Sequence, residues 1–558
     1  MAVLVPFALL LAPAAVPQET EVLLVEGLPL PGSPLLTVTS LNNPAVNAVG
    51  GWCAEVNLDD GVAALGAVYG TGTGAGPSLL VIEGTYGSYL QTSYESFLGL
   101  DSFGVPAYSP LVNDLVGGGV GLDAAWYGPT PVAIEGDPIL SLPGKVFRFN
   151  SRVDVISNTG EPVWVGGIND AGGAVEGNGL FRGFGQTAVL KEGDVVPNIL
   201  FPLDSSAIDF DFRFSPSGTH YITGVDVATG STTNDFHVVM DGAGLLIGGV
   251  LAQEGVLLPA ALQVDPAEAW FAFDSFGAAD DGSYLITGDT NGPLATDEFV
   301  LVDGAIVQRE GSAVGPYTIN GAIESAHLSA REDVGVVWDV DLPAAGGNVE
   351  ALFFNGRVVL REGDTIEVDV DGDMLTEVGT VRDFTGIATV VVGADRALYT
   401  TLDVDTLGTS STTDDTELLV RVAVPDLAAS ADTLSVSAGG TVDFTLFTPR
   451  DVEADLYLLA GSTSGTVPGL VVDGFPLPLN VDAYTLFSVT TPNHAPLAGN
   501  FGFVTDALGV EDASFSLPAA SDPAFAGVTV SHAYITLRLS PFALVTHASN
   551  AVDVLLVP

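Results

Sequence analysis

Basic residues are scarce in this sequence. Its 558 residues include 15 Lys and Arg against 69 Asp and Glu, which gives a formal net charge of −54 at pH 7. Nucleic-acid-binding proteins contact phosphates through Lys and Arg, so this composition excludes nucleic acid as a partner. Anionic membranes and polyanionic substrates are disfavoured for the same electrostatic reason. Cations are the natural counterparts of such a chain, and an acidic surface also keeps an exported protein soluble.

Cysteine and long apolar runs are also lacking. Cys53 is the single cysteine, so no disulfide forms within the chain, and a buried, unreactive thiol is expected there. Gly, Pro and Asp interrupt every apolar run, so we expect no membrane span. The apolar stretch 2–15 is too short to cross a bilayer, and Ala12-Pro13-Ala14 resembles a cleavage site. Together they predict a signal peptide over residues 1–15.

Several catalytic signatures are absent as well. The six histidines form no HExxH motif and no pair with zinc-ligand spacing. The sequence has no GxSxG elbow, no Walker A motif and no dinucleotide fingerprint between a strand and a helix. Serine, zinc and nucleotide chemistry are therefore unsupported. No long amphipathic helix is indicated either, so the chain is expected to be all-β.

An internal repeat dominates what the sequence does contain. A Glu-Gly pair follows an apolar run seven times, at intervals of 52 to 62 residues. A turn glycine, a strand with an aromatic residue and an acidic residue keep phase with the pair in most repeats. A glutamate present in every repeat is expected to do one structural job seven times, rather than to catalyse a reaction. The seven glutamates are Glu26, Glu83, Glu135, Glu192, Glu254, Glu310 and Glu362.

Each repeat predicts four short strands. In the fourth they span 209–215, 219–227, 235–242 and 245–253, and in the fifth 270–276, 283–289, 297–304 and 305–310. Four strands in about 50 residues is the size of a propeller blade. Residues 20–424 therefore predict a seven-bladed β-propeller with a period of about 56 residues, with an open β-solenoid as the alternative. We expect strand 21–25 to complete the last blade beside 416–422.

The repeat stops at Pro425, and residues 425–558 predict a C-terminal β-sandwich of the Ig-like kind. Short alternating strands with Gly and Pro turns continue to the end of the chain. Residues 432–447 predict a strand–Gly-Gly–strand hairpin. The Cys…Trp…Cys pattern of antibody domains is absent.

Both parts resemble proteins of exported bacterial families. The apolar run into Arg361-Glu362-Gly363-Asp364, with the turn glycine and strand after it, resembles tandem-repeat β-propellers of uncharacterised exported bacterial proteins. The tail, with LSVSAGGTVDFTL and HAYITLRLSP, resembles a C-terminal module of many secreted proteins from large-genome aquatic bacteria. The resemblance implies a secreted or cell-surface location, and it carries over no catalytic residue.

The acidic segment 367–377 is the candidate metal site. Asp369, Asp371 and Asp373, with Glu377 nearby, offer hard oxygen ligands, and Gly372 permits a sharp turn. Such residues suit Ca²⁺. The spacing departs from that of an EF-hand loop, and a solvated acidic loop is the alternative interpretation.

These observations favour a non-enzymatic extracellular or cell-surface protein. The propeller would be a monomeric binding or scaffold platform for an unidentified polysaccharide or protein. One alternative is a carbohydrate-active propeller enzyme, a hydrolase or lyase, that uses carboxylates of the central channel. Another is a calcium-stabilised adhesion or surface-layer component. An enzyme predicts non-repeating Asp, Glu, His or Arg residues at the channel, whereas a scaffold predicts only repeat-equivalent residues there.

Overall fold

The computed structural model describes residues 19–558, apart from 73–75, 229–232, 342–346, 374, 385–389, 410–411, 413, 452–453 and 541–542. The predicted signal peptide at 1–15 lies outside the described residues. Within them the chain is all-β except for one short α-helix, α1 (Ala483–Thr490), and one 3-10 turn, η1 (Pro523–Phe525). In this described part no helix is long and apolar enough to span a membrane.

Residues 19–423 form antiparallel sheets that follow one another along the chain. Within the described residues there are seven sheets of four to six strands, and a short β20–β21 hairpin (Leu246–Ile247, Val250–Leu251). The strands are β2 (Pro29–Leu30), β3 (Ser33–Val46), β4 (Trp52–Asp59), β5 (Ala64–Gly70) and β6 (Ser78–Ile82); β7 (Thr85–Tyr86), β8 (Tyr89–Leu100), β9 (Pro106–Asp114), β10 (Leu122–Tyr127) and β11 (Thr130–Ile134); β12 (Lys145–Ile156), β13 (Glu161–Asp170), β14 (Val175–Arg182) and β15 (Thr187–Lys191); β16 (Leu203–Phe214), β17 (Tyr221–Val227), β18 (Phe236–Met240) and β19 (Ala243–Gly244); β22 (Trp270–Ala278), β23 (Tyr284–Thr290), β24 (Glu298–Val302) and β25 (Ala305–Arg309); β26 (Ala313–Val314), β27 (Tyr317–Leu328), β28 (Val334–Asp341), β29 (Asn348–Phe354) and β30 (Arg357–Arg361); and β31 (Thr365–Val368), β32 (Glu377–Asp383), β33 (Val391–Val392), β34 (Ala397–Asp405) and β35 (Thr416–Ala423), joined by β1 (Glu19–Val25).

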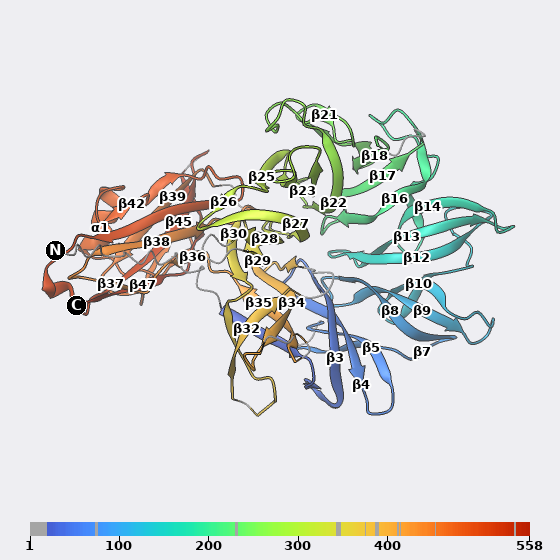
Figure 1. Cartoon of the computed structure of the whole chain (residues 1–558), viewed down its shortest axis with the longest axis horizontal. Helices are drawn as coiled ribbons and strands as arrows, with labels where there is room; N and C mark the ends of the chain where they lie inside the picture. The colour runs from blue at the N-terminus through green and yellow to red at the C-terminus, as the bar shows by residue number, and fades with distance from the viewer. Residues whose placement is uncertain are drawn as a thin grey trace, which may run out of the picture.

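The sheets surround a common centre in a β-propeller-like arrangement. Figure 1 shows them side by side, with the colour running from blue through green to yellow. The strands β3, β8, β12, β16, β22, β27 and β33 are the inner strands of the seven sheets, because their residues line one shared cavity.

The N-terminal strand joins the two ends of this arrangement. β1 pairs antiparallel with β35, with Thr20 opposite Val422 and Glu21 opposite Arg421. The predicted pairing of 21–25 with 416–422 is therefore confirmed. The blue first sheet lies beside the yellow last sheet in Figure 1. An open solenoid would leave the first and last repeats apart, so this pairing disfavours that alternative.

The repeated Glu-Gly pair marks the junction between successive sheets. At all seven positions the glutamate N–H donates to a carbonyl in the preceding sheet, over 2.9–3.1 Å. In six of the seven, the glycine N–H donates to the next sheet over 2.8–3.0 Å. Those six glycines have φ between 74° and 88°, a conformation that glycine adopts without steric cost. The positive φ and these hydrogen bonds therefore give the glycine a structural role in six repeats, whereas any residue except proline could supply the N–H of the glutamate.

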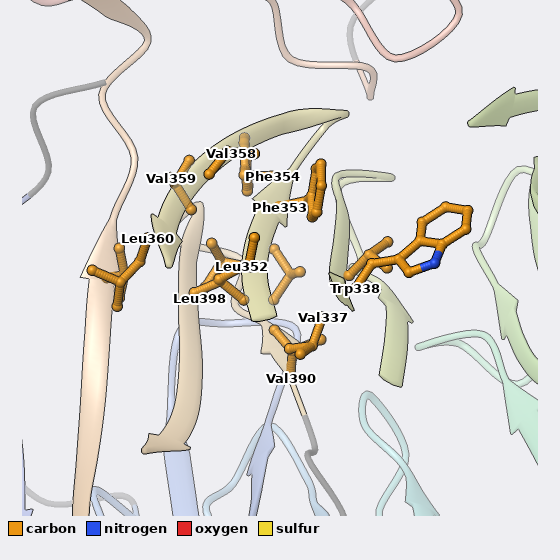
Figure 2. Close-up of a cluster of buried hydrophobic side chains, with 14 of the residues drawn as sticks. Val337, Trp338, Leu352, Phe353, Phe354, Val358, Val359, Leu360, Val390 and Leu398 are labelled. Carbon is orange, nitrogen blue, oxygen red and sulfur yellow. The ribbon is translucent and has the colours of Figure 1, made fainter. Parts of the chain in front are cut away.

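Apolar side chains fill the space between neighbouring sheets. Figure 2 shows Val337 and Leu352 of the sixth sheet close to Val390 and Leu398 of the seventh, in one buried cluster. Burial of this kind contributes about 25 cal/mol per Å² of apolar surface removed from water. The same packing continues around the molecule in further clusters of buried side chains.

The aromatic residues that keep phase with the Glu-Gly pair occupy two structural positions rather than one. Trp52, Tyr221 and Tyr284 begin the second strand of their sheets. Trp164 and Trp338 lie further along β13 and β28 and are fully buried. The number of residues between the glutamate and the start of the second strand differs from repeat to repeat, so counting from the glutamate does not preserve strand register.

The fourth repeat departs from the predicted strands. The segment 245–253 was expected to be one strand. It instead contains the β20–β21 hairpin, and the fourth strand of this sheet is the two-residue β19 that precedes it. Gly248 and Gly249, with φ of 56° and 82°, form the turn of this hairpin. The fifth repeat has its four strands where they were predicted.

The C-terminal residues form two sheets that share one buried core. The predicted hairpin at 432–447 is wrong, because the chain crosses between the sheets at Gly439-Gly440: β37 pairs parallel with β47, while β38 pairs with β44. Helix α1 also interrupts the short strands that were expected to continue to the end of the chain. One sheet contains β36 (Leu427–Ala429), β38 (Gly440–Phe447), β44 (Val510–Leu517) and β42 (Leu497–Ala498); the other contains β37 (Thr433–Ser435), β47 (Val552–Val557), β45 (Thr529–Arg538), β39 (Leu456–Ser462), β43 (Phe501–Phe503) and β46 (Leu544–Ala548), with a separate β40–β41 hairpin (Leu470–Val472, Phe475–Leu477).

A buried arginine connects these C-terminal sheets to the sixth and seventh sheets. Arg396 is 5% exposed and donates to both carboxylate oxygens of Asp333, over 3.0 and 3.1 Å. It also pairs with Asp426 and donates to the carbonyl of Phe447 over 2.9 Å. Phe354 packs against Phe447 with ring centroids 5.7 Å apart. The two parts therefore share a buried polar and aromatic contact.

Candidate functional site

The inner strands enclose a cavity of about 350 Å³ at the common centre. All seven sheets contribute to its lining. The lining residues lie near the end of each inner strand, where the chain turns toward the second strand. They fall within residues 43–48, 98–100, 152–157, 211–216, 274–278, 325–330 and 390–392.

The lining differs between the two sides of the cavity. The seventh, first and second sheets contribute mainly apolar residues, such as Val391, Ala45 and Leu98. The third to sixth sheets contribute the charged and titratable residues. These are Arg152, Asp154, Asp211, Arg213, Asp274 and His327.

One register position shows how the polar side departs from the repeat. The residue before the last paired residue of each inner strand lines the cavity. In five sheets it is small or apolar, whereas in the fourth and sixth it is Arg213 and His327. A scaffold predicts only repeat-equivalent residues at the channel. The lining of this cavity departs from that prediction. The five small or apolar residues are Ala45, Gly99, Val155, Gly277 and Val391.

Two arginines share one aspartate on the polar side. Arg152 Nη2 lies 2.8 Å from Asp211 Oδ1, and Arg213 Nη1 lies 3.2 Å from the same oxygen. The backbone N–H of Phe276 donates to Asp211 Oδ2 over 3.2 Å. Arg152 has a φ of 48°, a conformation that costs a non-glycine residue about 1–3 kcal/mol and is typical of functional sites. The surrounding strands thus hold this charged group in a fixed arrangement.

His327 is a neutral hydrogen-bond donor in this setting. Burial and the nearby Arg213 lower the pKa of His327 to about 3. The backbone N–H of Val392 donates to His327 Nδ1 over 3.1 Å. Because Nδ1 accepts, the single proton of the neutral ring lies on Nε2.

Asp154 is a second carboxyl group of the cavity, and its surroundings differ from those of the ion-paired Asp211. Burial raises its pKa, against the opposing effects of Arg213 and Arg152. Its Oδ1 accepts from the backbone N–H of Val155 over 2.7 Å. The cavity therefore combines a carboxyl group that favours its proton with Asp211, which carries two guanidinium partners.

A wider hollow of about 530 Å³ forms the mouth of the cavity. It shares Ala48, Pro216 and Ala330 with the cavity lining. Asp451, from the C-terminal part of the chain, also lines it and is held by Arg331, whose Nε lies 3.1 Å from Asp451 Oδ2. The cavity therefore opens at the turns between first and second strands, beside the C-terminal sheets.

The predicted calcium loop lies away from this cavity, after β31. The carboxylates of Asp369, Asp371 and Asp373 come within 4.8 Å of one another, so three of the four predicted ligands are brought together. Glu377 instead accepts from the backbone N–H of Val370 over 3.2 Å. Asp369 also accepts from the backbone N–H of Gly372 over 2.7 Å. The loop's own hydrogen bonds account for its shape, and calcium binding there stays a prediction.

Carboxyl groups also gather between strands and raise one another's pKa values. Burial, with Asp289 and Asp274 nearby, raises the pKa of Glu298 to about 9. The oxygens of these three residues lie within 4.8 Å of one another. Burial likewise raises the pKa values of five of the repeated glutamates, Glu83, Glu192, Glu254, Glu310 and Glu362.

No protein-family model matches the chain, and no curated protein matches it. Among solved structures, exo-β-1,3-galactanase from Phanerochaete chrysosporium with β-1,3-galactotriose covers 85% of this chain and 99% of its own, at 11% identity and a TM-score of 0.23. Its complex with galactose gives 10% identity and a TM-score of 0.23, covering 82% and 95%. Sucrose-6-phosphate hydrolase from Lactobacillus gasseri gives 9% identity and a TM-score of 0.16, covering 93% and 86%. Likeness this low carries no argument.

Arg213 and His327 were not singled out from the sequence, because neither belongs to a motif. The signal that finds them is the register of the inner strands. Aligning each inner strand on its pairing with the second strand places both where other repeats have Ala, Gly or Val.

Proposed function

We propose that this chain is an exported ligand-binding protein with its site in the axial cavity. Residues 20–424 form a seven-bladed β-propeller in this proposal, and residues 425–558 form an Ig-like β-sandwich docked beside the mouth. The resemblance to exported bacterial repeat proteins supports the extracellular location. Seven successive sheets and the β1–β35 pairing support the blade count.

The observation that carries the binding role is the cavity itself. Its volume of about 350 Å³ falls in the range of about 300–1,000 Å³ that small-molecule sites occupy. Non-repeating charged residues converge on it, although a purely structural ring would repeat the same small residues in every sheet. A small polar ligand, such as one sugar unit of a polysaccharide, fits this volume and lining.

A carbohydrate-active enzyme is the second candidate. The observation that favours it is the contrast between Asp154, whose pKa burial raises, and Asp211, which pairs with Arg152 and Arg213. Glycoside hydrolysis uses one carboxyl group as an acid and a second as a base or nucleophile. Asp154 would be the acid in such a reaction.

Filling the cavity should weaken ligand binding. Ser275 lines the cavity, so Ser275→Trp would occupy space that a ligand needs, whereas Ser275→Ala leaves the space open. Titration calorimetry with monosaccharides, sugar acids and amino acids should detect a ligand for the wild type and for Ser275→Ala. We expect Ser275→Trp to bind it at least about 10-fold more weakly, equivalent to about 1.4 kcal/mol.

The same titrations separate the two candidates. A ligand recovered unchanged supports binding alone. Cleavage of an oligosaccharide that Asp154→Asn abolishes supports the enzyme. Equal affinity of Ser275→Trp and wild type for every ligand that binds would show that the axial cavity is not the site.

A further inference from the structure

Two side chains on the polar side of the axial cavity have hydrogen-bond donors available for a ligand. Arg213 uses only Nη1 in its hydrogen bonds to the described residues, to Asp211 Oδ1 over 3.2 Å and to the carbonyl of Phe212 over 2.9 Å. Its side chain remains 32% exposed. The Nε and Nη2 donors of this guanidinium are therefore free to bind a ligand.

His327 provides the second donor. Its Nδ1 is occupied by the backbone N–H of Val392, and no described residue accepts a hydrogen bond from its Nε2. Arg213 and His327 line the same cavity of about 350 Å³, and the charge of Arg213 helps to lower the pKa of His327. A guanidinium beside a neutral N–H donor is a suitable partner for the two oxygens of a carboxylate.

The other cavity residues limit the charge of the ligand. Asp211 and Asp274 also line the cavity, so a dianion such as a phosphate monoester would meet their like charges within the same small volume. Asp274 belongs to the carboxyl cluster with Asp289 and Glu298. At the other charged group, Arg152 and Arg213 carry one positive charge more than their shared partner Asp211, so one ligand carboxylate can be matched there by Arg213.

The apolar side of the cavity indicates the rest of the ligand. Val390, Val391, Ala45 and Leu98, from the seventh, first and second sheets, bring no side-chain polar group to the cavity. A ligand that leaves these residues without water needs an apolar face of its own. A sugar ring with its C–H face, or a hydrocarbon acid, meets this condition.

We propose that the axial cavity binds a small monocarboxylate with an apolar face, whose oxygens accept from Arg213 and His327. This inference rests on the proposed ligand-binding role of the cavity. The net charge of −54 repels an anion from the surface, but salt screens that repulsion beyond a Debye length of about 8 Å at physiological ionic strength. Binding is therefore decided by the local donors.

Matched acid and neutral ligands test this proposal. Titration calorimetry would compare D-glucuronate with D-glucose, and benzoate with benzyl alcohol, on the full-length protein. We expect one acid of the two pairs to bind at least about 10-fold more tightly than its neutral partner, as a hydrogen bond to a charged group allows. The pair that shows the preference distinguishes a sugar acid from a hydrocarbon acid.

Substitution of the donor should remove the preference. Arg213→Met is expected to weaken binding of the acid by about 10- to 100-fold, the range for a charged hydrogen bond, while the neutral partner changes little. Arg148→Met is the matched control, because Arg148 lies on the inner strand β12, donates to Asn178 Oδ1 and does not line the cavity. It should bind the acid like the wild type.

Each outcome decides the proposal. Equal binding of acid and neutral ligand, or binding of neither acid, overturns it, and so does an equal loss in Arg213→Met and Arg148→Met. If neutral ligands bind and Ser275→Trp blocks them, the cavity remains the binding site and only the carboxylate preference falls. If ligands bind but Ser275→Trp leaves their affinity unchanged, the proposed function itself falls.

Discussion

Arg396→Met is expected to destabilise the protein by about 3–5 kcal/mol, the cost of breaking a buried ion pair by removing one partner. Asp333 is fully buried and would lose the partner that now binds both of its oxygens. The link to Asp426 and Phe447 in the C-terminal part would be lost as well. Urea unfolding followed by fluorescence measures the change, and separate transitions for the two parts would show that they had become uncoupled.

The control for this variant is an exposed ion pair that also joins the sixth sheet to the C-terminal sheets. Arg357 pairs with Asp512 at 2.6 Å, but their side chains are 33% and 64% exposed. Arg357→Met should therefore cost no more than about 1 kcal/mol. Adding Asp333→Asn to Arg396→Met should recover part of the loss, because it removes the unpaired charge. A loss below about 1 kcal/mol for Arg396→Met would contradict the role of this contact.

The protein should be less stable at pH 9 than at pH 6.5, by about 3 kcal/mol. Burial, with neighbouring carboxylates, raises the pKa of Glu298 to about 9 and that of Glu350 to about 8. The folded state holds these protons at pH 6.5, whereas the unfolded chain, with glutamate pKa values near ~4.3, does not. Raising the pH through the folded pKa values therefore removes stability. The expected loss of unfolding free energy is roughly half of the value that the two pKa shifts alone would give, because solvent screens partly exposed groups.

Glu298→Gln tests the cause of this pH dependence. The amide keeps the shape of the side chain and carries no charge, so the variant should be more stable than the wild type at pH 9 and close to it at pH 6.5. Glu324→Gln, at an exposed position of β27, is the matched control and should follow the wild type. Melting temperatures measured across this pH range would argue against the account if the Glu298→Gln and wild-type curves ran parallel.

The repeat could be recognised in the sequence because the same Glu-Gly junction recurs between successive sheets. In six of the seven copies, as at Glu310-Gly311, the Glu-Gly pair joins two sheets through two backbone hydrogen bonds and a glycine with positive φ, and this φ favours glycine at the second position. The pairing of 21–25 with 416–422 could be predicted because strand 21–25 precedes the first Glu-Gly pair and belongs to no complete repeat, which leaves it to complete the last one.

Two features of the C-terminal part, the Gly439-Gly440 turn and helix α1, could not be predicted from the local sequence pattern. The Gly439-Gly440 turn looks like a hairpin in the sequence, yet it carries the chain from one C-terminal sheet to the other. Helix α1 contains several β-branched and aromatic residues, which are typical of strands, so the composition does not indicate a helix there. Its sequence signal is the capping box of Asp482 and Thr485, which satisfies backbone donors at a helix start.

The candidate site could not be predicted from motifs. Arg213 and His327 come from different sheets, 114 positions apart in the chain, and meet only because the inner strands converge. The number of residues between the Glu-Gly pair and these positions varies from repeat to repeat, so sequence phase alone does not align them. Strand pairing supplies the alignment, and the two residues then stand out against Ala, Gly and Val.

Hydrogen–deuterium exchange with and without D-glucuronate, and again with benzoate, tests most directly whether a ligand binds at the axis. If the axial cavity is the binding site, one of these acids should slow exchange in peptides covering 152–156, 211–214 and 325–328, the segments of β12, β16 and β27 that line the cavity. Exchange in the acidic loop 369–373 and in the outer strands should not change. Protection confined to the outer strands or to the C-terminal sheets, or none on the inner strands with either acid, would contradict the central claim.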